Sequence, residues 1–117
     1  MRAGSLFMFA AIVLACTVAP PAEPVGTPAA TVELAADNLA FDRETLTVPA
    51  NAPFAITFEN RESPPHNVSI RGDGVLFVGE TFQGPARRTY VVPALPPGEY
   101  TFICDVHPDM RGTLTSQ

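Results

Sequence analysis

The chain has 117 residues, a length that suits one domain, and its hydrophobic content of 46% can fill one modest core. The formal net charge is −5, and every basic residue is an arginine. An acidic, lysine-free chain lacks the basic footprint that nucleic-acid binding requires, so we expect no nucleic-acid partner.

Residues 1–15 have the features of an export signal. A basic residue precedes an apolar run over residues 6–15, which is too short to span a bilayer comfortably. The stretch Val13-Leu14-Ala15-Cys16 resembles a bacterial lipobox, which implies cleavage before Cys16 and attachment of lipid to that cysteine. The alternative is an ordinary secretory signal cut elsewhere, for example after Ala19. We therefore expect an exported protein, lipid-anchored at the periplasmic or another extracytoplasmic membrane surface.

The cysteine count points towards a metal site. Only two cysteines occur, Cys16 and Cys104. If Cys16 is acylated or removed, Cys104 has no partner for an intramolecular disulfide. An unpaired thiol in an exported protein needs an explanation, because disulfides form and persist in such compartments. Service as a metal ligand is one of the few good explanations.

Residues 16–30 form a predicted tether. The segment contains four prolines and shows no apolar periodicity, which favours a semi-extended polyproline II linker. It would hold the following domain away from a membrane. A leftover segment with no spacing role is equally compatible with this composition.

Residues 31–117 predict an all-β sandwich of seven to eight strands. Short runs of Val, Ile, Thr and Phe alternate with proline and glycine turns, and no helix-period segment of useful length appears. Residues 37–44 form an expected loop in which Leu39 and Phe41 point inward. The expected strands cover residues 31–35, 45–48, 54–59, 66–70, 76–78, 87–92, 100–104 and 112–115.

The alternation of side chains along two strands predicts where a site lies. His66 shares a face with Val68 and Ile70, because successive side chains of a strand point to opposite faces. By the same rule, Cys104 shares a face with the core residue Phe102. Both residues therefore point into the interior, near one end of the sandwich.

A cluster of soft and borderline metal donors follows the last long strand. Cys104, His107 and Met110 lie within seven positions, and together with His66 they suit copper better than a hard cation. Taken singly, His66 is more simply a turn histidine, His107 a loop residue and Met110 core filler. The joint pattern of one mature cysteine, the only two histidines and a nearby methionine favours a shared metal ion.

The segment Cys104-x-x-His107-x-x-Met110, with Pro65-His66-Asn67-Val68 upstream, resembles the cupredoxin family of blue copper proteins. The loop spacing is similar to that of the amicyanin and plastocyanin branch, and it matches the short loop of amicyanin. The resemblance implies a Greek-key sandwich with one copper ion. It also implies that His66, Cys104 and His107 form a trigonal plane, with Met110 as the weak axial ligand.

The same resemblance implies supporting roles for neighbouring residues. Asn67 would hydrogen-bond towards the cysteine loop and hold the two ligand segments together. Asp105 follows the cysteine, where a small hydroxyl residue is more usual in the family. His107 would reach the surface as the electron port, beside Pro108 and Pro65.

The expected function is one-electron transfer by a monomer rather than catalysis, because no open coordination position or general base is evident. Expected partners are redox proteins such as a c-type cytochrome or a membrane oxidoreductase. Asp105 and Asp109 put negative charge near the expected electron port, which would attract a partner with a cationic face. The simpler interpretation is that both aspartates are only solvated loop residues. Copper storage or delivery is the main alternative function. A thiol enzyme is a second alternative, but it would need an exposed thiolate and a substrate cleft. A structural zinc site is a third, but methionine is a poor zinc ligand.

Overall fold

The computed structural model describes Gly4 and residues 26–117. Apart from Gly4, the predicted signal peptide lies outside the described residues, as do Cys16 and most of the predicted tether. The described chain contains nine strands and no helix, so no helix in this part is long and apolar enough to cross a membrane. The strands are β1 Thr31–Asp37, β2 Ala40–Phe41, β3 Thr45–Val48, β4 Phe54–Asn60, β5 Ser69–Gly72, β6 Val75–Val78, β7 Ala86–Val92, β8 Gly98–Ile103 and β9 Arg111–Ser116.

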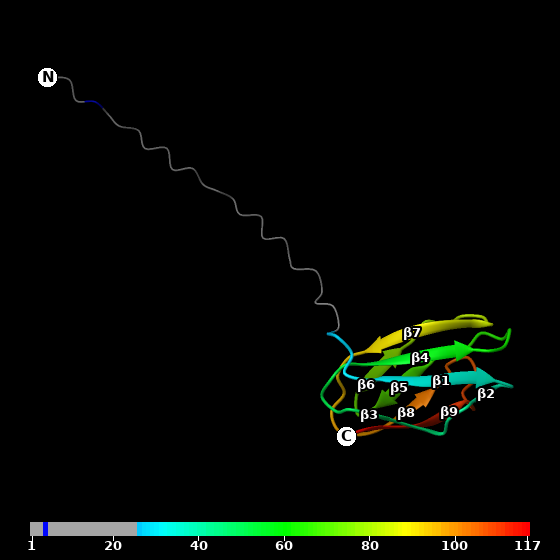
Figure 1. Ribbon diagram of the computed structural model, residues 1–117. Coiled ribbons are helices and arrows are strands. Elements are labelled where there is room, and N and C mark those ends of the chain that lie inside the picture. The colour runs from blue at the N-terminus through cyan, green and yellow to red at the C-terminus, as the bar shows by residue number, and fades with distance from the viewer. Residues whose placement is uncertain (1–3, 5–25) are drawn as a thin grey trace.

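The strands form two sheets that face each other across one core (Figure 1). One sheet has the order β2-β1-β4-β7, and the other has the order β3-β9-β8-β5-β6. The pairs β1–β4 and β3–β9 are parallel, and the remaining neighbours are antiparallel. This arrangement confirms the predicted all-β sandwich and adds one short strand, β2, in the segment expected to be a loop.

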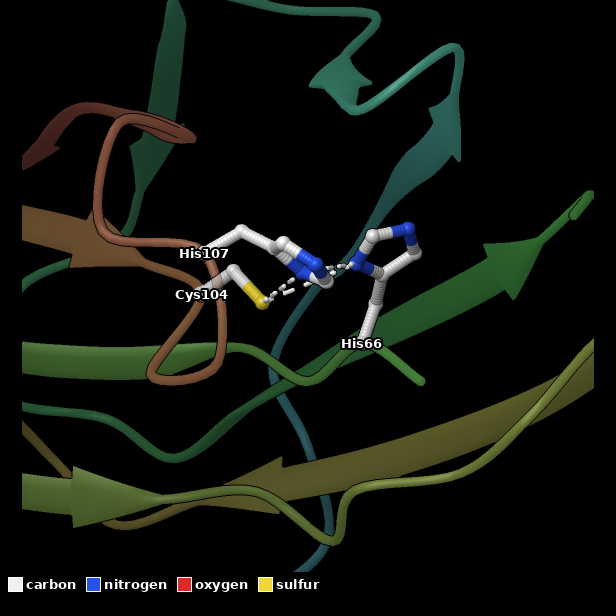
Figure 2. A group of neighbouring side chains, drawn as sticks. All are labelled: His66, Cys104 and His107. Atoms are coloured by element: carbon white, nitrogen blue, oxygen red, sulfur yellow. Dashed lines mark hydrogen bonds between the residues drawn. The ribbon is translucent and has the colours of Figure 1, made fainter. Parts of the chain in front are cut away.

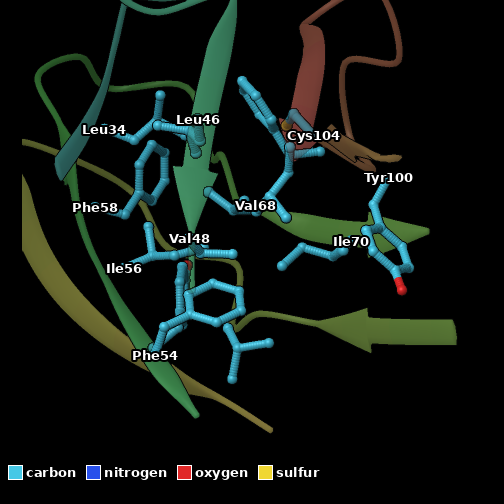
Figure 3. Close-up of a cluster of buried hydrophobic side chains, with 14 of the residues drawn as sticks. Leu34, Leu46, Val48, Phe54, Ile56, Phe58, Val68, Ile70, Tyr100 and Cys104 are labelled. Atoms are coloured by element: carbon cyan, nitrogen blue, oxygen red, sulfur yellow. The ribbon is translucent and has the colours of Figure 1, made fainter. Parts of the chain in front are cut away.

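The core follows the alternation that the sequence predicts. In β3, Leu46 and Val48 are buried, while the alternating Thr45 and Thr47 are exposed. Side chains from both sheets meet in the interior (Figure 3). Burying one large apolar side chain contributes about 1.5–3 kcal/mol, so the three fully buried phenylalanines are major contributors to stability. These are Phe54, Phe58 and Phe102.

The last residues of the predicted tether already pair with the sandwich. The backbone N–H of Ala29 donates to the carbonyl of Pro53 at 2.8 Å. The carbonyl of Ala30 accepts from the N–H of Ala55 at 2.9 Å. The chain is therefore fixed against the start of β4 before β1 begins.

The inward position expected for Leu39 is wrong. Asn38 and Leu39 both have positive φ, of 53° and 56°, in the tight turn between β1 and β2. This turn directs Leu39 outward, where it is 54% exposed. Phe41 packs inward as expected, with its ring centroid 5.4 Å from that of Phe102.

The strand expected over residues 66–70 begins later than predicted. β5 starts at Ser69, and His66 forms an isolated bridge with Phe82 instead. The N–H and carbonyl of His66 each bond to Phe82 at 3.1 Å. Between the bridge and β5, the N–H of Gly79 donates to the carbonyl of Val68 at 2.9 Å. His66 is thus held by backbone pairing on a segment that is not a regular strand.

Candidate metal centre

Three of the four predicted ligands meet at one end of the sandwich (Figure 2). The Sγ atom of Cys104 lies 3.7 Å from Nδ1 of His66 and 3.9 Å from Nδ1 of His107. The two Nδ1 atoms are 3.1 Å apart. The expected convergence of two distant chain segments on one point is therefore present.

The backbone fixes the loop that carries the thiol. Cys104 directly follows β8, and its N–H donates to the carbonyl of Met110 at 3.0 Å. The N–H of Met110 in turn donates to the carbonyl of His107 at 2.9 Å. These two bonds close residues 104–110 into a compact loop that leads into β9. The fourth predicted ligand, Met110, lies at the base of this loop and is buried, with 2% of its surface exposed.

The donor atoms have the spacing that a single metal ion requires. A triangle with sides of 3.1, 3.7 and 3.9 Å has a point equidistant from its corners. That point lies about 2.1 Å from each donor atom, close to the lengths of metal–nitrogen and metal–sulfur bonds in protein sites. Two imidazole nitrogens and one thiol sulfur also match the donor preferences of copper. The residues present therefore fit one copper ion.

Glu62 orients the buried histidine, a role that no pattern in the sequence indicates. Its Oε1 atom lies 2.7 Å from Nε2 of His66, whose side chain is fully buried. The same oxygen accepts from the backbone N–H of Leu39 at 2.9 Å. The Leu39 N–H, followed by the His66 imidazole, lowers the pKa of Glu62, so the carboxylate is the acceptor. We infer that His66 carries its proton on Nε2, which leaves Nδ1 free as a donor atom.

Asn67 joins the two ligand segments, as the family resemblance implies. Its amide nitrogen donates to Oδ2 of Asp105 at 2.9 Å, and its carbonyl oxygen accepts from the N–H of Asp105 at 2.8 Å. Asn67 follows one histidine and Asp105 follows the cysteine. This two-point pairing therefore fixes the main chain beside both His66 and Cys104.

The carboxylate of Asp105 has two further partners on β5. It accepts from the hydroxyl of Ser69 and forms an ion pair with the guanidinium of Arg71. Burial tends to raise the pKa of Asp105, but the hydrogen bonds from Ser69 and Asn67 and the charge of Arg71 outweigh it and lower the pKa. Asp105 is therefore ionised at neutral pH.

A surface hollow of about 320 Å³ opens beside the partly exposed His107. Two exposed apolar residues contribute to it, Leu39 and Val106, which are 54% and 46% exposed. Among the described residues, Pro108 lines the hollow as expected and Pro65 does not. The lining residues are Leu39, Val106, His107, Pro108, Asp109 and Met110.

Fold and site together define a class: a small β-sandwich with a mononuclear soft-metal centre at one end. A family model described as a cupredoxin-like domain matches residues 6–116. Amicyanin-alpha of Methylorubrum extorquens is 35% identical over 91 residues, which cover 74% of this chain and 72% of that protein. The chain belongs to the cupredoxin family of blue copper proteins, and its cofactor is one copper ion.

Solved structures support the same fold. Reduced auracyanin of Roseiflexus castenholzii superposes with a TM-score of 0.67 at 23% identity, over 78% of this chain and 99% of that one. Amicyanin of Paracoccus versutus superposes with a TM-score of 0.60 at 25% identity, over 78% of this chain and 85% of that one. The sandwich seen here is thus the cupredoxin architecture.

Proposed function

We propose that the protein is a one-electron carrier in which His66, Cys104, His107 and Met110 hold the copper ion. The observation that carries this proposal is the meeting of two imidazole Nδ1 atoms and one thiol Sγ within 4.8 Å of one another. Copper bound there supplies a Cu(II)/Cu(I) couple, so the centre accepts one electron from a donor protein and passes it to an acceptor.

The scaffold favours electron transfer because it holds the donors in one arrangement. Loop backbone bonds fix Cys104 and Met110, and Glu62 fixes the ring of His66. Donors that keep their positions in both oxidation states need little reorganisation when the charge changes. The full burial of Cys104 argues against a thiol enzyme, whose nucleophile must reach a substrate.

The hollow beside His107 is the proposed place of electron exit and entry. His107 is the partly exposed ligand, whereas His66 and Cys104 are fully buried. A c-type cytochrome or a membrane oxidoreductase is a suitable partner for this apolar surface. The exposed Asp109 adds negative charge at its rim, while the charge of Asp105 is offset by Arg71. Any attraction of a cationic partner therefore rests on Asp109 more than on Asp105.

We further propose that the protein works as a monomer at an extracytoplasmic membrane surface, anchored by lipid on Cys16. The support is the apolar run over residues 6–15 and the lipobox-like stretch that ends at Cys16. Residues 16–30 would then act as the tether between lipid and domain. Mass spectrometry of the mature protein tests this: a diacylated Cys16 at the amino terminus supports it, and an unmodified terminus at residue 20 contradicts it.

Redox titration separates electron transfer from copper delivery. We expect the copper-loaded protein to pass reversibly between oxidised and reduced forms, with the Nernst slope of a one-electron couple. We also expect it to keep its copper in the presence of excess chelator. We expect slow release of copper because backbone hydrogen bonds close the loop over residues 104–110 and because the Cys104 thiol is buried. Copper that transfers to the chelator within minutes in either oxidation state would instead favour delivery or storage.

Replacing Glu62 with alanine is expected to weaken copper binding about 10–100-fold, the usual cost of removing a residue that orients a ligand. Without the carboxylate, the Nε2 proton of the buried His66 loses its partner, and the ring is free to turn. Glu62→Gln retains an oxygen acceptor and should lose less. Competition with a chelator measures both, with Glu99→Ala as an exposed control. Equal affinities for Glu62→Ala and Glu99→Ala would show that Glu62 does not support the ligand.

A further inference from the structure

A row of three polar side chains on one face of a single segment surrounds Asp105. Two of them, Ser69 and Arg71, lie within β5, and Asn67 lies two residues before Ser69. These alternate positions share the face opposite the buried Ile70. All three donate to the Asp105 carboxylate: Asn67 and Ser69 to Oδ2, and Arg71 to Oδ1. Both carboxylate oxygens are therefore engaged.

These contacts fix a negative charge one residue along the chain from the thiol, on the face away from the core. Asp105 follows Cys104 in the chain, and the antiparallel pairing of β5 with β8 places Ser69 opposite Ile103, the residue before the cysteine. The Arg71 side chain is 53% exposed, whereas that of Asp105 is 27% exposed. The compensating positive charge is therefore more accessible to solvent than the negative charge that it offsets.

We propose that the Arg71–Asp105 ion pair sets the reduction potential of the copper centre, with Asp105 and Arg71 acting as positioning and charge-balancing residues rather than as ligands. The inference rests on the proposed function. Asp105 fixes the main chain next to the residue that carries the thiolate, and Arg71 offsets the negative charge that Asp105 places one residue along the chain from Cys104.

The sign of the effect follows from electrostatics. The oxidised centre carries one more positive charge than the reduced centre, so a nearby uncompensated carboxylate stabilises the oxidised form. Removing the charge of Arg71 leaves Asp105 uncompensated and should lower the reduction potential. Removing the charge of Asp105 leaves Arg71 and should raise it.

The chain offers a matched control pair. Arg87 and Glu59 form an ion pair on the four-stranded sheet, with 62% and 36% of their side chains exposed. The variants Arg87→Gln and Glu59→Gln change the net charge by the same amounts as Arg71→Gln and Asp105→Asn. Any difference between the two sets therefore reports on position and not on total charge.

The test is a redox titration of the copper-loaded wild type, Arg71→Gln, Asp105→Asn, the double variant and both controls at low ionic strength. We expect Arg71→Gln to lower, and Asp105→Asn to raise, the ratio of reduced to oxidised protein at a fixed solution potential severalfold. A tenfold change in this ratio corresponds to about 59 mV for a one-electron couple. The double variant should lie between the singles, and the controls should stay near the wild type.

A second readout uses the protein without metal. Exchange of the backbone amide at position 105 should be faster in Asp105→Asn and Arg71→Gln than in the controls, because the carboxylate helps to hold the Asn67 pairing. The inference would be overturned if the reduction potential shifted in the same direction in both single variants. It would also be overturned if the potential of Arg71→Gln shifted no more than that of Arg87→Gln. Should Asp105→Asn fail to fold, the comparison of Arg71→Gln with Arg87→Gln still decides. A wild type that binds copper without reversible one-electron chemistry would instead count against the proposed function.

Discussion

Replacing Cys104 with serine should abolish the intense blue absorption and reversible redox chemistry of the copper-loaded protein. Only the thiolate supplies the soft, charged donor among the three clustered side chains, and a neutral hydroxyl is a poor substitute. Copper affinity should fall by more than the about 10–100-fold loss typical of removing a merely supporting residue.

The control for this variant is Thr101→Ala, an exposed change on the same strand that should leave both absorption and affinity unchanged. The thermal unfolding of each metal-free variant shows whether the fold persists. A folded Cys104→Ser protein that retains the absorption band would place the metal elsewhere.

Replacing Phe102 with alanine should lower the free energy of unfolding by about 3–5 kcal/mol, the usual cost of truncating a buried phenylalanine. The Phe102 ring is fully buried and packs closely over Gly112, where an added Cβ would lie 2.2 Å from the Phe102 Cζ atom. Phe41 contacts the same ring from the other sheet. Neighbouring groups therefore cannot refill the space easily.

Urea unfolding of the metal-free protein measures this effect, with Thr101→Ala again as the matched control, at the preceding position of β8. The control should change stability by less than about 0.5 kcal/mol. A loss below about 1 kcal/mol for Phe102→Ala would mean that the core collapses onto the cavity, contrary to the packing seen here.

The part of the site that lies on regular strands follows from the sequence. Cys104 comes directly after an alternating strand, and its inward direction is set by Tyr100 and Phe102, both of which are buried. Two-residue periodicity is enough to predict such a position. The soft ligand set and its spacing then indicate the metal and the family.

The supporting contacts do not follow from periodicity. The alternation that turns Val68 and Ile70 inward predicts that Asn67 and Ser69 face away from the core, yet both are buried, because the loop that begins at Asp105 covers their face. A loop that covers a strand is a tertiary event, which no local pattern reports. The signal present in the sequence is polar residues at three alternate positions, 67, 69 and 71, together with an aspartate directly after the cysteine.

Glu62 and Leu39, in loops that follow strands of the four-stranded sheet, show the same limit. A carboxylate four residues before a histidine is common, and only the turn at Asn38, which directs the Leu39 N–H to the same oxygen, gives it a structural role. The turn conformation depends on two residues with positive φ, neither of which is glycine. Sequence alone therefore favoured an inward Leu39.

The most direct test of the metal centre is a titration of the mature protein with Cu(II), followed by visible absorption. We expect a strong thiolate-to-copper band at about 600 nm that grows until one equivalent is bound. Uptake of Cu(II) without that band, or no uptake at all by the folded protein, would contradict the assignment of Cys104, His66 and His107 to a single copper site.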